Sequence, residues 1–203
     1  VHGYIPFKEY LQQFEWGKDW FVAAFGGLQK DLSTMGLDRI SALPVANVAI
    51  GRWFGPLGLR LSGFGSLNRY YEEPYMMAMA YAGGRVEGMV DLVSFVNPQS
   101  TSPFEVDLLA GYQGSLVYRP FTQYTRNWAV TGGLTSAVQL KYYAREGLGI
   151  FVEPRYSWIG YQRVLRDGGQ TVDFSHKVAD VSVGMEVRQK NITRMDLRRS
   201  YVD

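Results

Sequence analysis

The sequence contains no cysteine, which excludes disulfides, thiolate metal sites, cysteine nucleophiles and a lipidated N-terminal cysteine. It has only two histidines in 203 residues, so the material for enzymatic chemistry is thin. No run of about 18 apolar residues occurs, and therefore no transmembrane helix is predicted. The net charge of +2 is too balanced to indicate nucleic-acid binding. The chain opens at Val1 without the basic and apolar regions of a signal peptide, which we expect to have been removed.

What the sequence does contain favours β-structure. Hydrophobic residues make up 46% of the chain and aromatic residues 15%, which is ample for a folded core. The 23 glycines, 14 tyrosines and 11 phenylalanines, set against 20% charged residues, indicate strands and interfaces more than helical bundles.

The clearest pattern begins after a tight turn at residues 54–56. From position 57 to 68, leucines occupy one parity, while Arg60 lies at the middle of the more polar parity. This period of two predicts a strand with one apolar and one polar face. Seven more segments are predicted to be strands, which makes eight in all: residues 19–29, 42–53, 81–96, 104–118, 128–142, 148–161 and 178–187.

The predicted connections alternate in length. Polar links follow the first, third, fifth and seventh strands, at residues 30–41, 69–78, 119–127 and 166–177, and shorter links follow the others. Pro154 lies on the apolar parity of its strand, where the missing N–H predicts a local bulge. Residues 1–18 and 191–203 are expected to be terminal segments flanking one barrel domain at 19–190.

The charges on the strands share the polar parity and are mixed in sign. Three charges on one face of a strand cannot be buried unpaired against an apolar core. If the polar parity faces inward, we expect these residues to form a charge network in the lumen: Arg60, Arg85, Glu87, Asp91, Glu105, Asp107, Lys141, Glu153, Arg155, Asp180 and Glu186.

Aromatic residues gather at the strand ends, as in the girdles of membrane barrels. One predicted girdle contains Trp20, Trp53, Phe54, Phe95, Phe104 and Tyr142, and the other contains Tyr70, Tyr71, Tyr118, Phe121, Trp128 and Tyr161. Together these features predict an all-β, eight-stranded, antiparallel up-and-down transmembrane β-barrel. The alternative is a soluble lipocalin-like barrel binding a small apolar ligand, in which the apolar parity faces inward and the charges face water.

Four stretches carry a resemblance to a known family: residues 51–68, 85–96, 104–112 and 151–158 (GRWFGPLGLRLSGFGSLN, RVEGMVDLVSFV, FEVDLLAGY and FVEPRYSW). Over about residues 19–190 the chain resembles the eight-stranded outer-membrane β-barrels of Bacteroidota, relatives of the OmpA transmembrane domain. The resemblance implies a place in the outer membrane of a Gram-negative cell envelope, with both termini periplasmic, and no catalytic residue. The basic tail at 191–203 departs from barrels that end on an aromatic residue, and suggests a periplasmic continuation or a docking segment.

Eight strands leave an interior wide enough for side chains only, so a wide pore is not expected. The prediction is a non-enzymatic anchor, scaffold or subunit of an outer-membrane complex, in contact with lipid, lipopolysaccharide and protein partners and without a cofactor. A narrow ion path is the alternative to a plugged lumen. Ser175 and His176 are interpreted as a solvated loop rather than as a catalytic pair. Asp91, Glu105 and Asp107 could form a cation site, but pairing with Arg60, Arg85 or Lys141 is the favoured interpretation.

Overall fold

A computed structural model describes residues 19–32, 43–72, 75–98, 100–118, 128–145, 147–165, 171–173 and 176–189. The predicted terminal segments at 1–18 and 191–203 lie outside these ranges. The elements in chain order are β1 (Asp19–Asp31), β2 (Leu43–Phe54), β3 (Leu57–Glu72), β4 (Tyr75–Asp91), α2 (Leu92–Val96), β5 (Phe104–Tyr118), β6 (Trp128–Arg145), β7 (Leu148–Leu165), β8 (Thr171–Asp173) and β9 (His176–Arg188).

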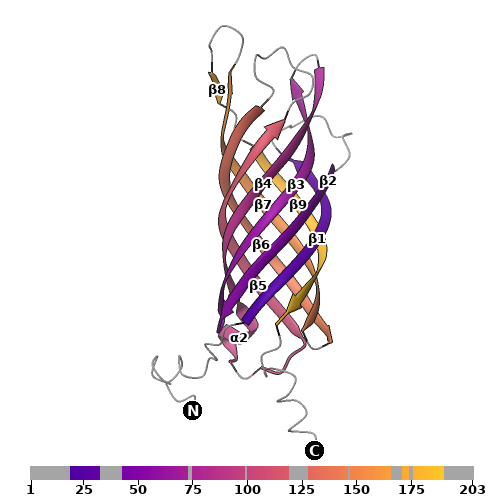
Figure 1. Cartoon of the computed structure of the whole chain (residues 1–203), viewed down its shortest axis with the longest axis vertical. Coiled ribbons are helices and arrows are strands. Elements are labelled where there is room, and N and C mark those ends of the chain that lie inside the picture. Colours follow the sequence, from indigo (N-terminus) through magenta and orange to yellow (C-terminus); the bar gives the residue numbers. More distant parts are fainter. Residues whose placement is uncertain are drawn as a thin grey trace, which may run out of the picture.

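The strands close into a tall barrel (Figure 1). Each strand from β1 to β7 pairs antiparallel with the next, β7 pairs with β9, and β9 pairs back onto β1. The short β8 pairs only with the end of β7, as a hairpin beyond the ring. The predicted fold, a closed eight-stranded up-and-down barrel, is therefore confirmed, and full closure leaves no unpaired edge among the eight strands.

The two ends of the barrel differ. At one, here called the turn end, β2 meets β3 and β6 meets β7 in tight turns, and α2 lies between β4 and β5 (Figure 1). Gly55 and Gly147 make these two turns with positive φ angles of 64° and 72°, which glycine adopts without a steric penalty. Strands β1, β3, β5 and β7 end at the opposite end of the barrel, called the loop end.

Three predicted boundaries are wrong. Residues 166–177 are not one polar loop, because they include β8, and His176 is not a loop residue, because it begins β9 and pairs with Ile159. The tyrosine-rich stretch 69–78 is not a long loop, because β3 and β4 stay paired as far as Glu72 and Tyr75, as suits residues of high β-propensity. The fourth strand ends at Asp91 rather than at residue 96. The Asp91 carboxylate accepts hydrogen bonds from the N–H and hydroxyl of Ser94 and so caps the one-turn helix α2.

The predicted bulge at Pro154 is also wrong. The β7–β9 register runs unbroken through Pro154 opposite Val181, and the β6–β7 register is the same on both sides of it. The proline therefore removes one N–H donor from the hydrogen-bond ladder but does not insert an extra residue into the strand. Irregularities in the β6–β7 pair occur instead between Gly132 and Gly133 and between Tyr143 and Arg145.

The alternation of side chains sets the inside and the outside of the barrel. Leu59 and Val181 point outward and are 57% and 53% exposed, whereas Arg60 and Glu87 point inward and are 1% and 0% exposed. This distribution is opposite to the one that the lipocalin-like alternative requires, in which apolar side chains fill the interior. Within the described ranges no helix is long and apolar enough to cross a bilayer.

Candidate functional site: the charged lumen

The polar residues predicted for the lumen all lie inside the barrel. None of the eleven is more than 6% exposed: Arg60, Arg85, Glu87, Asp91, Glu105, Asp107, Lys141, Glu153, Arg155, Asp180 and Glu186. They come from six strands, and the period-two geometry of each strand turns them inward. Ions buried in this way must be paired and hydrogen-bonded to be tolerated.

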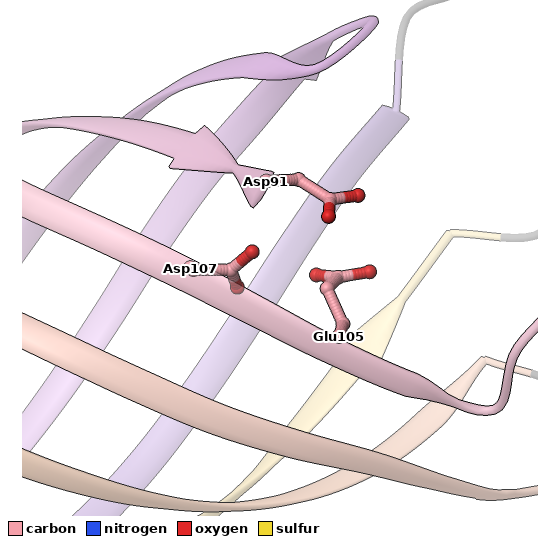
Figure 2. Close-up of side chains that lie close together, drawn as sticks. All are labelled: Asp91, Glu105 and Asp107. Carbon is pink, nitrogen blue, oxygen red and sulfur yellow. The ribbon is translucent and has the colours of Figure 1, made fainter. Parts of the chain in front are cut away.

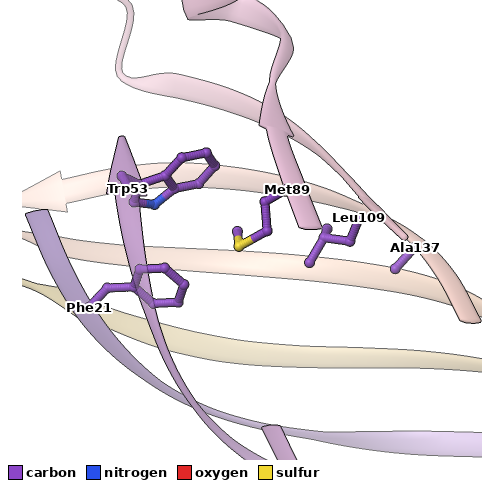
Figure 3. Close-up of a cluster of buried hydrophobic side chains, with 5 residues drawn as sticks. All are labelled: Phe21, Trp53, Met89, Leu109 and Ala137. Carbon is purple, nitrogen blue, oxygen red and sulfur yellow. The ribbon is translucent and has the colours of Figure 1, made fainter. Parts of the chain in front are cut away.

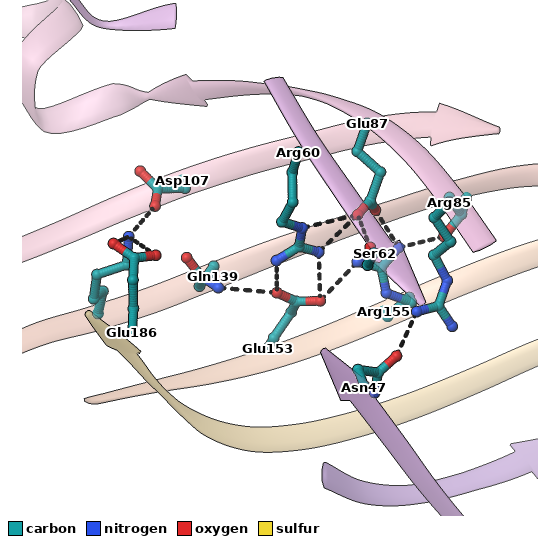
Figure 4. Close-up of polar contacts among 12 residues, drawn as sticks. Asn47, Arg60, Ser62, Arg85, Glu87, Asp107, Gln139, Glu153, Arg155 and Glu186 are labelled. Atoms are coloured by element: carbon teal, nitrogen blue, oxygen red, sulfur yellow. Dashed lines mark hydrogen bonds and ion pairs between the residues drawn. The ribbon is translucent and has the colours of Figure 1, made fainter. Parts of the chain in front are cut away.

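Four of them form what we call the central ion group: Arg60, Glu87, Glu153 and Arg155 (Figure 4). Arg60 makes a bidentate contact with Glu153, at 2.7 Å from Nη1 to Oε2 and 3.0 Å from Nη2 to Oε1, and its Nε lies 2.9 Å from Glu87 Oε2. Arg155 donates to Glu153 at 2.6 Å and also to Glu87. Two guanidinium and two carboxylate charges balance, so the group is neutral as a whole.

The central ion group crosses the whole lumen. In the ring of eight strands, β3 and β7 lie four positions apart, and the Arg60–Glu153 contact therefore joins opposite walls. Gln139 Nε2 donates to Glu153 at 3.0 Å, and Ser62 Oγ donates to Glu87 at 3.3 Å. These contacts tie four strands, β3, β4, β6 and β7, together through their side chains.

A second group surrounds Lys141 near the turn end. The Lys141 Nζ atom lies 2.9 Å from Glu105 Oε1, 3.1 Å from Asp107 Oδ2 and 3.0 Å from Glu186 Oε1, which uses all three donors of the ammonium. The Tyr143 hydroxyl donates to Glu105 Oε2 at 3.2 Å, and Arg188 lies 3.4 Å from the same oxygen. Arg188 also pairs with Asp19.

At the loop-end side of the lumen, Arg85 makes hydrogen bonds to neutral side chains. Its Nε donates to Gln113 at 3.1 Å and its Nη1 to Asn47 at 2.6 Å, while the guanidinium lies 4.0 Å from the centre of the Phe64 ring. Asp180 is buried nearby, opposite Arg155 in the β7–β9 register. The sequence suggested Arg60, Arg85 or Lys141 as partners for the acidic residues at the turn end, and among these it is Lys141 that contacts Glu105 and Asp107.

The lumen also holds apolar side chains, which the sequence reasoning missed. Figure 3 shows one cluster, and the second contains an edge-to-face pair of Phe25 and Phe151 with ring centres 5.4 Å apart. The first cluster contains Phe21, Trp53, Met89, Leu109 and Ala137. Parity is the signal that identifies them: Met89, for example, has the same inward parity as Glu87 and Asp91 on β4. The interior is thus filled by both ionic and apolar groups.

One residue of the predicted girdles is misplaced. Trp53 is 1% exposed and packs against Phe21 inside the barrel, so it does not belong to the outer aromatic girdle. It lies inside because it shares the inward parity of β2, and Gly58 makes room for it: a Cβ there would lie 2.9 Å from the indole. Arg52, on the outward parity, has its guanidinium 4.8 Å from the centre of the Phe54 ring.

The other turn-end aromatic residues lie on the outside. Trp20 (44%), Phe95 (46%), Phe104 (60%) and Tyr142 (46%) are exposed, Phe54 is partly exposed, and the Phe104 and Tyr142 ring centres are 5.1 Å apart. At the loop end, the side chains of Tyr70, Tyr71, Tyr118, Trp128 and Tyr161 lie outside the described set, as do residues Phe121 and Ser175. The loop-end girdle therefore stays a prediction.

The comparisons with known proteins concern the fold. Searches against protein-family models and curated proteins find no match. Among solved structures, Neisserial surface protein A (NspA) matches with a TM-score of 0.62 and 15% identity, over 83% of this chain and 96% of that one. OprG of Pseudomonas aeruginosa matches with a TM-score of 0.58 and 10% identity, over 88% and 99%.

Ail, the attachment invasion locus protein of Yersinia pestis, matches with a TM-score of 0.51 and 12% identity, over 86% of this chain and all of that one. None of these three proteins is described as coming from Bacteroidota, so the resemblance to barrels of that group stays a prediction. This chain therefore has the fold of the eight-stranded outer-membrane β-barrels.

Proposed function

We propose that this protein is an integral barrel of a bacterial outer membrane, with the turn end in the periplasm and the loop end outside the cell. The observation that carries the proposal is the exposed apolar wall around a charged, paired interior. In water such a wall would expose far more contiguous apolar surface than soluble proteins tolerate. In a bilayer the same wall faces acyl chains, and the closed ladder leaves no strand edge in the hydrocarbon.

The height of the wall supports this proposal. Along β1, outward side chains run from Trp20 through Val22 and Leu28 to Lys30, both ends being exposed. The ten residue-to-residue steps from Trp20 to Lys30 rise about 3.3 Å each, so on a strand tilted by about 40° they span about 25 Å. That is the height of the apolar band of outer-membrane barrels, with an aromatic residue at one edge and a cation at the other.

Lipopolysaccharide is the proposed lipid partner at the loop end. Lys30 and Lys177 are both exposed on neighbouring strands, where the Leu32 N–H donates to the Lys177 carbonyl at 2.7 Å. Ammonium groups at the edge of the apolar band are well placed to pair with the phosphates of outer-leaflet lipid.

The function proposed for the barrel is non-enzymatic: it acts as an anchor, scaffold or subunit of an outer-membrane complex whose loops or periplasmic ends contact protein partners. The lumen supports this role better than transport, because the central ion group joins opposite walls and apolar clusters fill the space around it. Because this role is non-enzymatic, His176→Ala should leave lipid A acylation and esterase activity unchanged.

Membrane extraction tests the proposal. The protein should leave native membranes only with detergent, and on a denaturing gel the unboiled form should migrate faster than the boiled form. Planar-bilayer recordings should show no conductance steps, and copurification from native membranes should identify the partners. Recovery of a folded monomer from the soluble fraction without detergent would contradict the proposal.

A further inference from the structure

Three carboxylates converge at the turn end of the lumen, where β4 gives way to α2. Asp91 ends β4, and Glu105 and Asp107 lie two residues apart near the start of β5. Figure 2 shows their carboxyl groups directed into one common space. One oxygen from each residue lies within 4.8 Å of the others, and the three residues are 4%, 1% and 0% exposed.

The strand register makes this arrangement electrostatically costly. Asp91 and Asp107 lie directly opposite each other in the β4–β5 ladder, on the same inward face. Like charges at opposed positions of a sheet are destabilising, and burial strengthens the repulsion. Nearby, Lys141 contacts Glu105, Asp107 and Glu186, and Arg188 contacts Glu105 and Asp19. Even with both cations counted, this region carries more negative than positive charge in its described contacts.

One atom of the cluster is left without a hydrogen bond. Asp107 is fully buried, and its Oδ2 accepts from Lys141, but within the described part of the chain its Oδ1 has no hydrogen-bond partner. A buried carboxylate oxygen without a donor costs free energy that a bound cation would recover. This orphaned oxygen is the observation, independent of the clustering itself, that points to a ligand.

We propose that Asp91, Glu105 and Asp107 bind one divalent cation of the calcium class. Three carboxylates are a hard oxygen set, which suits calcium or magnesium rather than zinc or copper. Two calcium–oxygen bonds of about 2.4 Å on opposite sides of the ion span about 4.8 Å, whereas magnesium, with bonds of about 2.1 Å, spans about 4.2 Å. The three ligand oxygens lie within 4.8 Å of one another, close enough to contact one ion. Calcium also accepts flexible coordination geometry, whereas magnesium requires a near-ideal octahedron and keeps several of its waters, so a fixed set of buried carboxylates suits calcium better.

The cation would fasten the turn end of the barrel. It would join the last residue of β4, which also caps α2, to the first turn-end residues of β5, and would screen the opposed Asp91 and Asp107. Binding to the folded state alone raises apparent stability by mass action. This inference concerns a binding site in the lumen and does not depend on the partners proposed above.

The test uses the full chain, refolded from the denatured state into detergent. Lipopolysaccharide is left out because it binds divalent ions itself. After chelation and dialysis, the urea midpoint is measured against added CaCl₂ and, separately, MgCl₂, and calcium binding is measured by titration calorimetry. CaCl₂ should raise the midpoint saturably, and MgCl₂ should have a smaller effect at equal concentration. Asp107→Asn should weaken calcium binding by about tenfold or more.

Two further variants keep the outcome interpretable. Asp180→Asn also removes a buried lumen carboxylate, but outside the cluster, and should retain the calcium response. Asp91→Asn preserves a helix-capping residue type and serves if Asp107→Asn fails to refold. The proposal is overturned if CaCl₂ leaves the wild-type midpoint unchanged, or if wild type, Asp91→Asn and Asp107→Asn respond equally.

Discussion

The central ion group predicts that Glu153→Gln strongly lowers the free energy of unfolding. Glu153 accepts from Arg60 at 2.7 and 3.0 Å, from Arg155 at 2.6 Å and from Gln139 at 3.0 Å, and it is 0% exposed. The substitution keeps the volume but, among the ion pairs of the described residues, leaves Glu87 as the one carboxylate in contact with the two guanidinium groups. Removing one partner of a buried ion pair costs about 3–5 kcal/mol, so the free energy of unfolding should fall by that amount.

A double-mutant cycle distinguishes ion pairing from simple loss of packing. Arg60→Met alone leaves an excess carboxylate and should be similarly costly, but combined with Glu153→Gln it leaves the balanced pair Glu87 and Arg155. The double variant should therefore cost about 1–3 kcal/mol less than the sum of the single variants.

Urea unfolding in lipid vesicles, followed by tryptophan fluorescence and by gel mobility, measures each variant. Thr101→Ala, at an exposed position between α2 and β5, is the control and should stay within about 0.5 kcal/mol of wild type. Additive single costs, or a loss below about 1 kcal/mol for Glu153→Gln, would refute the assignment of the group as a buried, mutually compensating network.

Three other predictions follow from the same structure. Gly114→Ala should preserve or raise stability, because the nearest atom to an added Cβ lies at an ordinary contact distance of 3.9 Å. Gly111→Ala on the same strand should destabilise the protein, because its Cβ would lie 1.9 Å from a backbone oxygen. The urea midpoints of the two variants test this difference. Leu59→Lys on the outer wall should cost about 2–4 kcal/mol in vesicles if the residue lies near the bilayer midplane, far more than Leu59→Gln in the same unfolding assay. Trp53→Ala should lower the free energy of unfolding by about 3–5 kcal/mol, because the indole is buried. It should also remove a fluorophore that is shielded from aqueous iodide, and ready iodide quenching of Trp53 in the wild type would contradict its placement in the lumen.

Much of the architecture could be predicted from the sequence because the side chains of a strand alternate with a period of two. The parity of Arg60 and Glu87 determined that they share a face, and the mixed charges on that face required pairing. What parity cannot predict is contact across the lumen. Arg60 and Glu153 are 93 residues apart in the chain. They meet because closure and stagger of the eight strands bring β3 opposite β7.

The errors have a common physical origin. The residue type of Trp53 and its place near a strand end predict the outer girdle, whereas the parity that it shares with Asn47 indicates the interior. The Glu-Glu-Pro sequence at 72–74 interrupts the alternation and predicts a loop, whereas β3 and β4 stay paired up to Glu72 and Tyr75. In both cases local composition points one way and the strand register the other, and in a barrel the register determines which face a side chain takes.

The most direct test of the inside-out barrel uses the absence of native cysteine. Single variants Leu59→Cys, Leu108→Cys and Val181→Cys, each spin-labelled and reconstituted in lipid vesicles, report whether their positions face acyl chains or water. The labels should collide readily with oxygen dissolved in the bilayer and be protected from a water-soluble nickel chelate. Ready collision with the nickel chelate at all three positions would show that the apolar wall does not face lipid.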